Sequence, residues 1–558
     1  MTVTTAPRPS PDWAARLGGL SPSDRLLFTL MGGLALLTLA LGISYGVAMA
    51  LARSGAIDFL PETPYRVLTV HGMTAFFYWL YSAQATILLV LAAGEKQGGI
   101  ELRSFAWIGA VLVAAGFAVS ELSALTGTPL LYNANPELGQ DDPQVVGGMA
   151  GGYLLLAAGL VCLSVSAIAT TLAAARRGAS PGFSALGFGL FAWAGFLIVS
   201  AVAAANAFLP NLLWALGYAT FPADATTEWH ILFHNMHYLP LMATVLAWYA
   251  IARALTGTGS ITGAAFSKIV FASYLVFVPP TSLYHMFLEP NLPEGVRVAG
   301  SLLSLFVSVP TVTAFLIVVA SLEAHARANG ATGLFGWMRR LPWADPAVAN
   351  MGVAMLTMLI GLVFAFVLIQ EKLAPLLSDT MFVPGYFHFF AVGTITQTFL
   401  AAMMVALPVI SGRPLWRPAV LSRMPWIVLA GLVLFGAGGI AAGFLGVPRR
   451  VVDIGYDGAA PALWRPLMSL VGIGGIAFAA ALSVSVYGVA RSLLPARKHP
   501  AVTREPVRIK AMAPVAAGAA WTGPIAVLVM VAAMYGATIG AFELIQALPV
   551  TAAGGGGH

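Results

Sequence analysis

The sequence has little charge and almost no cysteine. Of its 558 residues only 9% are charged, whereas 59% are hydrophobic, and the mean hydropathy is +0.85. A soluble globular protein carries charge on about a quarter of its residues, so this composition excludes a soluble fold and predicts an integral membrane protein. Cys162 is the only cysteine. This excludes a disulfide framework and any iron–sulfur or paired-copper centre built from cysteines of this chain.

Long apolar runs dominate the rest of the chain. A helix needs about 20 apolar residues to cross the hydrocarbon of a membrane. Thirteen runs meet this need, near residues 27–52, 69–93, 105–126, 146–175, 183–207, 228–255, 269–288, 299–321, 349–370, 382–410, 425–446, 464–491 and 521–545. The alternating polarity of a membrane barrel is missing. We therefore predict an all-α polytopic membrane helix bundle of about thirteen transmembrane helices.

The apolar runs also suggest how the chain is divided. We expect a cytoplasmic N-terminal segment at 1–26 and a twelve-helix cofactor-binding core at 27–491, followed by a cytoplasmic linker at 492–520. The thirteenth transmembrane helix would cover 521–545 and a tail 546–558. The polar leading segment has no apolar stretch followed by a cleavage site, so the first run is interpreted as a retained helix rather than a signal peptide.

The basic residues are unevenly distributed between the two sides of this bundle. With a cytoplasmic N-terminus, 21 of the 28 Lys and Arg residues fall in segments on the cytoplasmic side. This is the positive-inside asymmetry that sets the orientation of membrane proteins. The positive charge is therefore a topology signal and not a nucleic-acid surface. The most basic stretch, residues 491–510, is expected to contact anionic membrane lipid at most.

Six histidines share the outer third of the predicted membrane, although they come from four separate spans. They are His71 in span 2, His230, His234 and His237 in span 6, His285 in span 7 and His388 in span 10. A single intramembrane histidine is often only a hydrogen-bond partner between helices. Six at one depth predict a bound cofactor, because imidazole is costly in hydrocarbon and is a usual ligand of heme, copper and iron.

Span 6 is the richest of these segments. His230, His234 and His237 lie on one stripe of a helix, and Tyr238 lies one turn after His234. Together with Tyr284-His285 of span 7, they can hold copper or nonheme iron. The alternative is a polar stripe that lines a water-filled entry.

Span 10 begins with Val-Pro-Gly-Tyr-Phe-His. Tyr386 and His388 point about 200° apart on a helix, so this one segment can touch two cofactors.

Several separated motifs resemble subunit I of the heme-copper oxidase superfamily, most of all its B-type (ba-type) branch. They are His71-Gly72, the His-x-x-x-Tyr of His234 and Tyr238, Tyr284-His285, the span 10 motif, Leu334-Phe335-Gly336-Trp337 with Leu341-Pro342-Trp343, and Val447-Pro448-Arg449-Arg450. Their order and the span count agree over almost the whole chain.

The resemblance implies a respiratory redox subunit of a bacterial or archaeal cytoplasmic membrane. It implies that a low-spin heme b is held between His71 and His388, and that Arg449 and Arg450 neutralise the heme propionates. Ordinary solvated loop charges are the alternative for the two arginines. The electron donor implied is a separate redox subunit, a cytochrome or a cupredoxin.

This chain departs from the family pattern at the reaction centre. Tyr386 stands where the family has the histidine of a high-spin heme, and Tyr284-His285 stands where it has two consecutive copper-binding histidines, with His234 as the third ligand. We expect Tyr238, Tyr284 and Tyr386 to line this centre. Tyrosinate can ligate heme iron, but it favours the ferric state, so an ordinary oxidase reaction is in doubt.

Three hypotheses stay open. In the first, His230 or His237 replaces the lost copper ligand, Tyr386 holds or approaches a second heme, and a small oxidant, O2 or NO, is reduced. In the second, that centre is lost and the protein is a one-heme electron-transfer subunit. In the third, the chain is a membrane transporter, although inverted repeats and broken helices are not evident.

A reductase of either kind also needs protons. Tyr238, Tyr249, Ser308, Thr311 and Thr313 offer hydroxyls along spans 6 and 8, the route of the B-type branch. The alternative for such hydroxyls is simple hydrogen bonding between helices.

Overall fold

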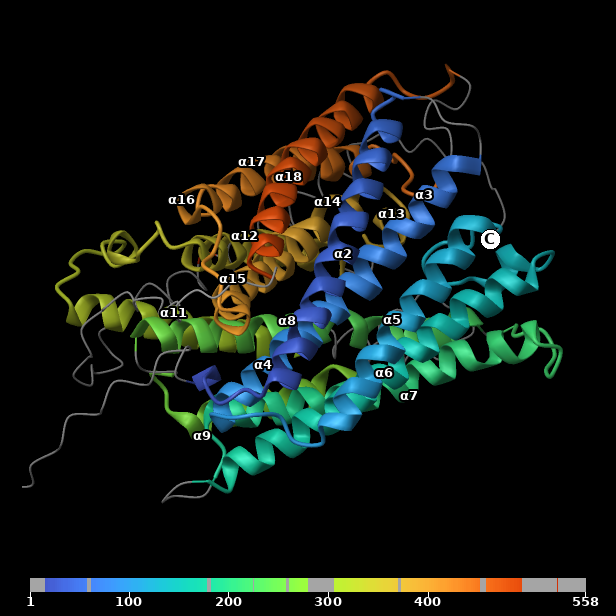
Figure 1. Ribbon diagram of the computed structural model, residues 1–558. Helices are drawn as coiled ribbons and strands as arrows, with labels where there is room; N and C mark the ends of the chain where they lie inside the picture. Colours follow the sequence, from blue (N-terminus) through green and yellow to red (C-terminus); the bar gives the residue numbers. More distant parts are fainter. Residues whose placement is uncertain are drawn as a thin grey trace, which may run out of the picture.

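A computed structural model describes residues 16–57, 62–177, 182–223, 225–256, 260–279, 306–369, 373–451, 458–493 and residue 529. Over these ranges the chain is almost entirely helical (Figure 1). Eleven of the described helices are long and apolar enough to cross a membrane. The predicted all-α membrane bundle is therefore confirmed. The expected thirteenth span at 521–545 lies, apart from residue 529, outside the described residues.

The helices follow the order that the apolar runs predict. The first six spans are α2 (Pro22–Arg53), the continuous α3, η1 and α4 (Glu62–Gly72, Met73–Trp79, Leu80–Lys96), α5 (Arg103–Thr126), α6 (Pro143–Ala175), α7 (Ala185–Ala215) and α8 (Ala225–Thr256). The later ones are α11 (Val309–Ala328), α12 (Pro346–Leu368), the continuous α14, η5 and α15 (Phe382–His388, Phe389–Thr396, Gln397–Ser411), α17 (Met424–Phe444) and α18 (Trp464–Leu493). The apolar helix α9 (Ala264–Phe277), at the start of the predicted seventh span, is shorter. Short helices η2 (Pro136–Gly139), η4 (Met338–Arg340), α13 (Ala374–Leu377) and α16 (Pro418–Leu421) lie between them.

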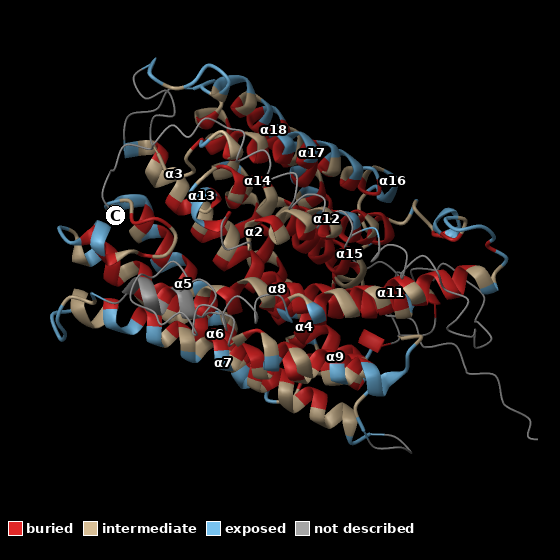
Figure 2. Ribbon diagram, turned by 180° about the vertical axis from the view of Figure 1, so that it is seen from behind, coloured by how far each residue is buried: buried red, intermediate tan, exposed pale blue. Residues whose placement is uncertain are grey.

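The spans that carry the predicted ligands occupy the middle of the bundle. Buried residues make up 89% of the apolar window of the span Glu62–Lys96, 83% of that in Leu232–Thr256 and 78% of that in Phe382–Ser411, but only 39% of that in α5. Figure 2 shows the same division, with buried residues in the centre and exposed ones on the outer helices. The outer helices present large apolar side chains such as Leu122, Val202 and Ile473. This arrangement suits lipid outside and a polar site inside.

At each end of the bundle, ion pairs and hydrogen bonds join segments that are remote in sequence. At one end Glu95 pairs with Arg16 at 3.3 Å and with Arg253 at 2.8 Å. At the other end the Arg53 guanidinium donates to the carbonyls of Pro448 and Arg449. Segments that the loop charges assign to one side of the membrane thus lie together.

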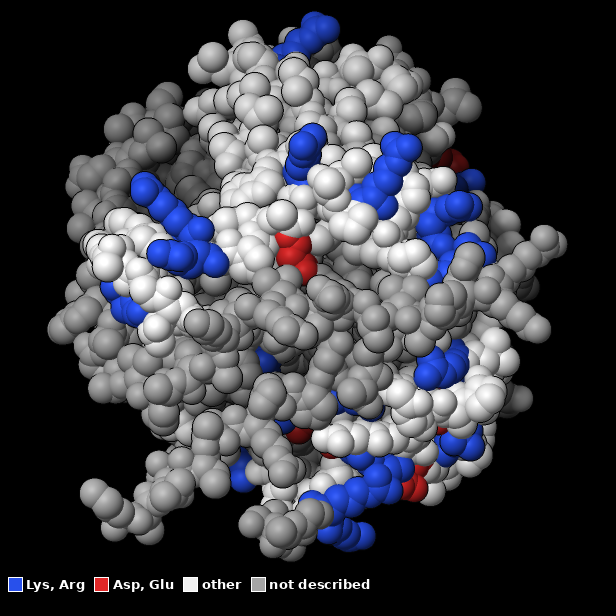
Figure 3. All heavy atoms as spheres, turned by 60° about the vertical axis from the view of Figure 1, so that its left-hand side comes forward, with Lys and Arg blue, Asp and Glu red and all other residues white. Residues whose placement is uncertain are grey.

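One end of the bundle is rich in basic side chains. Figure 3 looks onto the side that carries the ends of α11 and α16, where Lys and Arg gather with few acidic residues between them. Such an end is expected to face the cytoplasm. The absolute orientation rests on this charge and stays a prediction.

Two central spans are interrupted by π-helix, a rare geometry that often marks functional sites. The segment η1 begins two residues after His71, and η5 begins directly after His388. Their last residues are joined, because the Trp79 Nε1–H donates to Thr396 Oγ1 at 2.8 Å. Each of these residues follows its histidine by eight positions. The bond therefore links corresponding points of the two spans.

Helices α5 and α6 approach closely through glycines. A Cβ atom on Gly116 would lie 2.6 Å from the carbonyl oxygen of Gly152, so the two backbones are in contact. Small residues permit this kind of packing between membrane helices.

We expect Gly116→Ala to destabilise the bundle, because the new methyl group must push α5 away from α6. Gly195→Ala in α7 is the matched control, since no atom lies within 4 Å of its added Cβ. The control should be neutral or stabilising by up to about 1 kcal/mol through helix propensity. Thermal unfolding in detergent measures both variants. Equal melting temperatures for the two variants would contradict the close contact.

Candidate functional site

The imidazole of His71 is held against α2. Its Nδ1 lies 2.9 Å from the carbonyl oxygen of Gly42, and because a carbonyl can only accept, Nδ1 carries the proton. A Cβ on Gly46 would lie 2.9 Å from the ring, so only glycine leaves room for the imidazole there. These contacts fix the ring and leave Nε2 as the nitrogen with a lone pair.

His388 has the same arrangement in α14. Its Nδ1 lies 2.7 Å from the carbonyl oxygen of Pro384, which again leaves the lone pair on Nε2. The ring of Phe435 from α17 packs beside it, with 4.5 Å between ring centroids. The imidazoles of His71 and His388 are near enough to interact electrostatically. Both are half-buried, although they lie in the central spans. Two imidazoles prepared in this way fit axial ligation of a heme iron.

Two arginines lie at the outer end of the same region. The Arg449 guanidinium donates to Asp379 Oδ1 at 3.0 Å, and its buried Nε has no hydrogen-bond partner among the residues that the structure describes. Arg450 donates to the Tyr132 hydroxyl at 3.4 Å and lies over the Tyr132 ring. Burial, and then the charge of Arg450, lower the pKa of Arg449, whereas Asp379 acts in the opposite direction. The two adjacent guanidiniums have one carboxylate partner, Asp379, which pairs with Arg449. They can therefore bind a further anion, such as the propionates of a heme.

The third group lies where α8 faces α14. The rings of His234 and Tyr238 are stacked, with 6.2 Å between centroids, and the Tyr238 side chain is hydrogen-bonded to Ser308. Tyr386 lies within electrostatic range of Tyr238 and of Arg449. The structure thus brings His234, Tyr238 and Tyr386 to one place between these helices.

Tyr386 and His388 have different neighbours, as their spacing predicts. Tyr386 packs between Phe382 and Phe390, whereas His388 packs against Phe435. Of these two side chains, His388 is the one that interacts electrostatically with His71.

His237 lies apart from His234 in an aromatic cage. Its ring contacts Phe76, Phe233 and Phe387, with centroid distances of 4.9, 4.2 and 5.0 Å. Its Nδ1 lies 2.7 Å from the carbonyl oxygen of Phe233. Among the described residues, the ring neighbours of His237 are thus apolar aromatic side chains.

The structure describes only some of the predicted copper or nonheme iron ligands. Tyr284 and His285 lie outside the described residues, as does the side chain of His230. Among the side chains that the structure does describe, no three His, Cys, Asp or Glu residues are grouped as a metal site. A metal centre at His234 thus stays a prediction.

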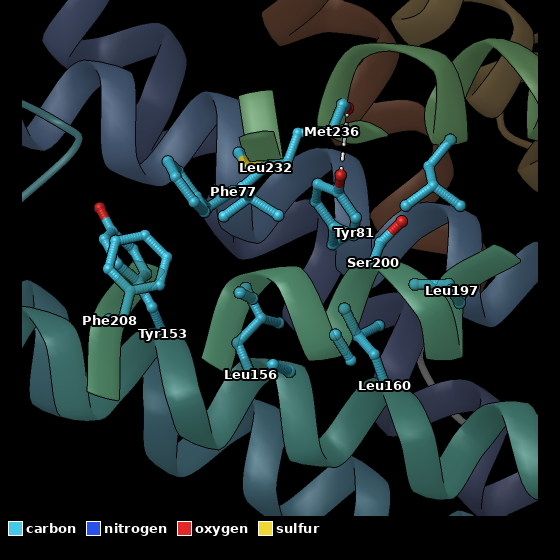
Figure 4. A pocket seen from close by; sticks show the side chains of 14 residues that line it. Phe77, Tyr81, Tyr153, Leu156, Leu160, Leu197, Ser200, Phe208, Leu232 and Met236 are labelled. Carbon is cyan, nitrogen blue, oxygen red and sulfur yellow. Dashed lines mark hydrogen bonds between the residues drawn. The ribbon is translucent and has the colours of Figure 1, made fainter. Parts of the chain in front are cut away.

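A pocket lies on the opposite face of α8. Figure 4 shows it between α6, α7, α8 and the second span, with mainly apolar side chains around it. The Tyr81 hydroxyl donates to the carbonyl oxygen of Met236 at 3.0 Å. Leu232, Met236 and Leu239 point into this pocket, whereas His234 and Tyr238 occupy other positions of the helix. The pocket is therefore separate from the histidine site.

Several features of the site have no signal in the sequence. The π-helices after His71 and His388 are invisible to a search based on a 3.6-residue period, and Asp379 and Tyr132 are remote in sequence from the arginines that they bind. Sequence analysis named Thr311 but missed Tyr274, whose hydroxyl lies 2.7 Å from that of Thr311. The position of Tyr274 in span 7 was its only available signal.

Comparison with known proteins agrees with this arrangement. Residues 27–477 match the family model described as cytochrome c and quinol oxidase polypeptide I. The chain is 27% identical over 505 residues to cytochrome c oxidase subunit 1 of Thermus thermophilus, with 86% of each chain covered. Its fold is similar to a cryo-EM structure of a heme-copper terminal oxidase dimer, with a TM-score of 0.77, 18% identity and 93% of each chain covered. Because the family model spans most of its length, this chain belongs to the subunit I family of the heme-copper oxidases.

Proposed function

We propose that this chain is a membrane oxidoreductase subunit in which His71 and His388 hold one low-spin heme b. The observation that carries the proposal is that the two imidazoles have the same hydrogen-bond pattern. In each, Nδ1 is bonded to a backbone carbonyl and Nε2 is left for iron. When bound, such a heme supplies one-electron redox chemistry. His71 and His388 would hold this heme, and Arg449 and Arg450 would pair with its propionates.

We further propose that a small oxidant, O2 or NO, is reduced beside His234, Tyr238 and Tyr386, at an altered heme or metal centre of B-type character. Tyr238 and Tyr386 both carry an ionisable hydroxyl there, and Tyr238 stacks on His234. The competing proposal is a one-heme electron-transfer subunit, which the replacement of two family ligands by Tyr284 and Tyr386 favours.

A chain of hydroxyls supports the catalytic proposal. Ser267 donates to Ser260 at 3.0 Å and lies 3.1 Å from the Tyr249 hydroxyl. Tyr274 and Thr311 form a separate pair, with 2.7 Å between their hydroxyl oxygens, and Tyr274 interacts electrostatically with Tyr249 and Tyr238. Ser308, three residues before Thr311, is bonded to Tyr238. Hydroxyls that can both donate and accept allow a proton to pass from the basic end of the bundle toward Tyr238.

The electron donor is proposed to act through a separate redox subunit. The relative from Thermus thermophilus is named a cytochrome c oxidase subunit, which favours a cytochrome c as the source of electrons. Cys162 cannot form a cysteine-built redox centre alone, so this chain needs a partner for electron entry.

His71→Ala and His388→Ala should each abolish the low-spin heme spectrum of the purified protein, because each removes one axial ligand. His325→Ala, at the basic end of α11, is the control and should keep the spectrum. Optical spectra of the reduced protein measure all three variants. A low-spin spectrum that persists in both ligand variants would overturn the bis-histidine assignment.

Cofactor content should separate the two proposals. Two hemes and one copper or nonheme iron per chain, with carbon monoxide binding to the reduced protein, would support the altered reaction centre. One heme, no further metal and no carbon monoxide binding would support the electron-transfer subunit. Pyridine hemochrome assays with metal analysis measure these ratios.

Thr396→Val should change the environment of the low-spin heme, because it removes the bond between Trp79 and Thr396 that links the two ligand-bearing spans. Thr398→Val removes the same kind of bond, from Trp248 Nε1 to Thr398 Oγ1 at 2.8 Å, between α8 and α15. Both should lose roughly 1–3 kcal/mol of stability. Only Thr396→Val should shift the electron paramagnetic resonance signal of the heme, and Thr396→Ser should restore it. Identical signals in the two valine variants would contradict this positioning role.

Tyr274→Phe should slow turnover by roughly 10²-fold, the lower end of the range for positioned proton transfer, because it removes the hydroxyl that is bonded to Thr311. Heme content should not change. Tyr487→Phe, at an exposed position of α18, is the control. Oxidant consumption with a chemical electron donor measures the rate, and an unchanged rate in Tyr274→Phe would rule out this route.

A further inference from the structure

Glu121 is a carboxylate inside the membrane that the proposed reaction does not use. It lies in α5, five residues before the helix ends at Thr126, and only 8% of its surface is exposed. The Tyr45 hydroxyl donates to Glu121 Oε1 at 2.6 Å, and the Thr74 hydroxyl donates to Oε2 at 2.7 Å. An acidic residue at such a position is costly and usually functional.

The surroundings of Glu121 are neutral hydroxyls. Besides its two hydrogen-bond partners, it interacts electrostatically with Tyr78 of η1 and Tyr153 of α6. Tyr78 is itself bonded to Ser120 at 2.7 Å.

The charged groups of the neighbouring helix α3 are directed elsewhere. The guanidinium of Arg66 donates to the carbonyl oxygen of Gly127 and pairs with Glu62 at 3.9 Å. Among the residues that the structure describes, Glu121 takes part in no ion pair. An ionised Glu121 would therefore be stabilised by hydrogen bonds alone.

Both partners of Glu121 flank the proposed heme ligand. Tyr45 precedes Gly46, where an added Cβ would lie 2.9 Å from the His71 ring. Thr74 follows His71 by three residues, about one turn along the same span. The carboxyl group is thus coupled to the two helices that hold His71, without touching His71 itself.

We propose that Glu121, with Tyr45 and Thr74, is a redox-linked proton site for the heme held by His71, an inference that rests on the proposed function. With the heme bound, the Glu121 carboxylate would take up one proton when an electron from the separate donor enters this site. The carboxyl would release that proton when the electron leaves. A change of one charge is expensive in a low-dielectric interior, and protonation nearby compensates for it.

The two hydroxyl partners suit this exchange. A hydroxyl donates to an ionised carboxylate and can rotate to accept from a protonated one. The same site therefore remains hydrogen-bonded in both states. Because Glu121 lies near the end of α5, its proton exchanges with the outer aqueous phase.

A redox titration of the heme-loaded full-length protein at a series of pH values tests the proposal. In the unchanged protein the midpoint potential of the low-spin heme should fall as pH rises, since reduction takes up a proton. Glu121→Gln mimics the protonated carboxyl and should remove this slope. Glu137→Gln, at an exposed outer position of η2, is the matched control and should keep it.

Two further measurements guard against a folding effect. Tyr45→Phe keeps the carboxyl but removes one donor to its ionised form, so the sloping region should move to higher pH. Infrared difference spectra between the reduced and oxidised protein should contain a carboxyl C=O band that Glu121→Gln lacks. An equal pH slope in the unchanged protein and Glu121→Gln, with the heme bound in both, would overturn this inference alone. Failure of the unchanged protein to bind a bis-histidine heme would overturn the proposed function, and this inference with it.

Discussion

An imidazole buried in a membrane must satisfy both of its nitrogens, and this constraint organises the site. At His71 and at His388 a backbone carbonyl takes the Nδ1 proton, so each ring has one defined tautomer and one nitrogen left for a metal. Neither carbonyl acceptor depends on another side chain, since Gly42 and Pro384 provide them through the backbone. The His71 ring is thus oriented by the packing of its span against α2, and the His388 ring by a carbonyl of its own helix α14.

The features that depend on periodicity and charge were predictable from the sequence. Runs of about 20 apolar residues located the spans, and the loop charges grouped the helix ends that Glu95 and Arg53 tie together. The membrane depth of His71 and His388, which we predict from where each span begins, stays a prediction. The features that depend on tertiary contact were not predictable. Nothing in a linear pattern shows that Asp379 binds Arg449. Nor does it show that His234 stacks on Tyr238 whereas His237 lies in an aromatic cage.

The two tyrosines at the proposed reaction centre change its chemistry more than its shape. Tyr386 occupies α14 two positions before His388, and it lies within electrostatic range of Tyr238. A phenol holds its proton more tightly than an imidazole does, so it is neutral where a histidine ligand would already offer a lone pair. The low-spin heme site proposed at His388 therefore does not imply a reaction centre at Tyr386, although both residues lie in α14. The hydroxyl chain through Tyr274 and Ser308 matters here because it leads to Tyr238 rather than to His71.

Charge near the low-spin site is distributed between two opposite environments. The guanidiniums of Arg449 and Arg450 lie at the outer loop and favour an anion, whereas Glu121 lies inside the bundle with hydroxyl partners only. Arg449 cannot lose its proton under ordinary conditions, because an arginine pKa remains high even when burial lowers it. A carboxyl group has no such limit. In the proposed function, a charge that changes with electron transfer at His71 would therefore be compensated on the side of α5, where the Glu121 carboxyl can gain or lose a proton. The arginines would contribute a constant positive charge in both redox states.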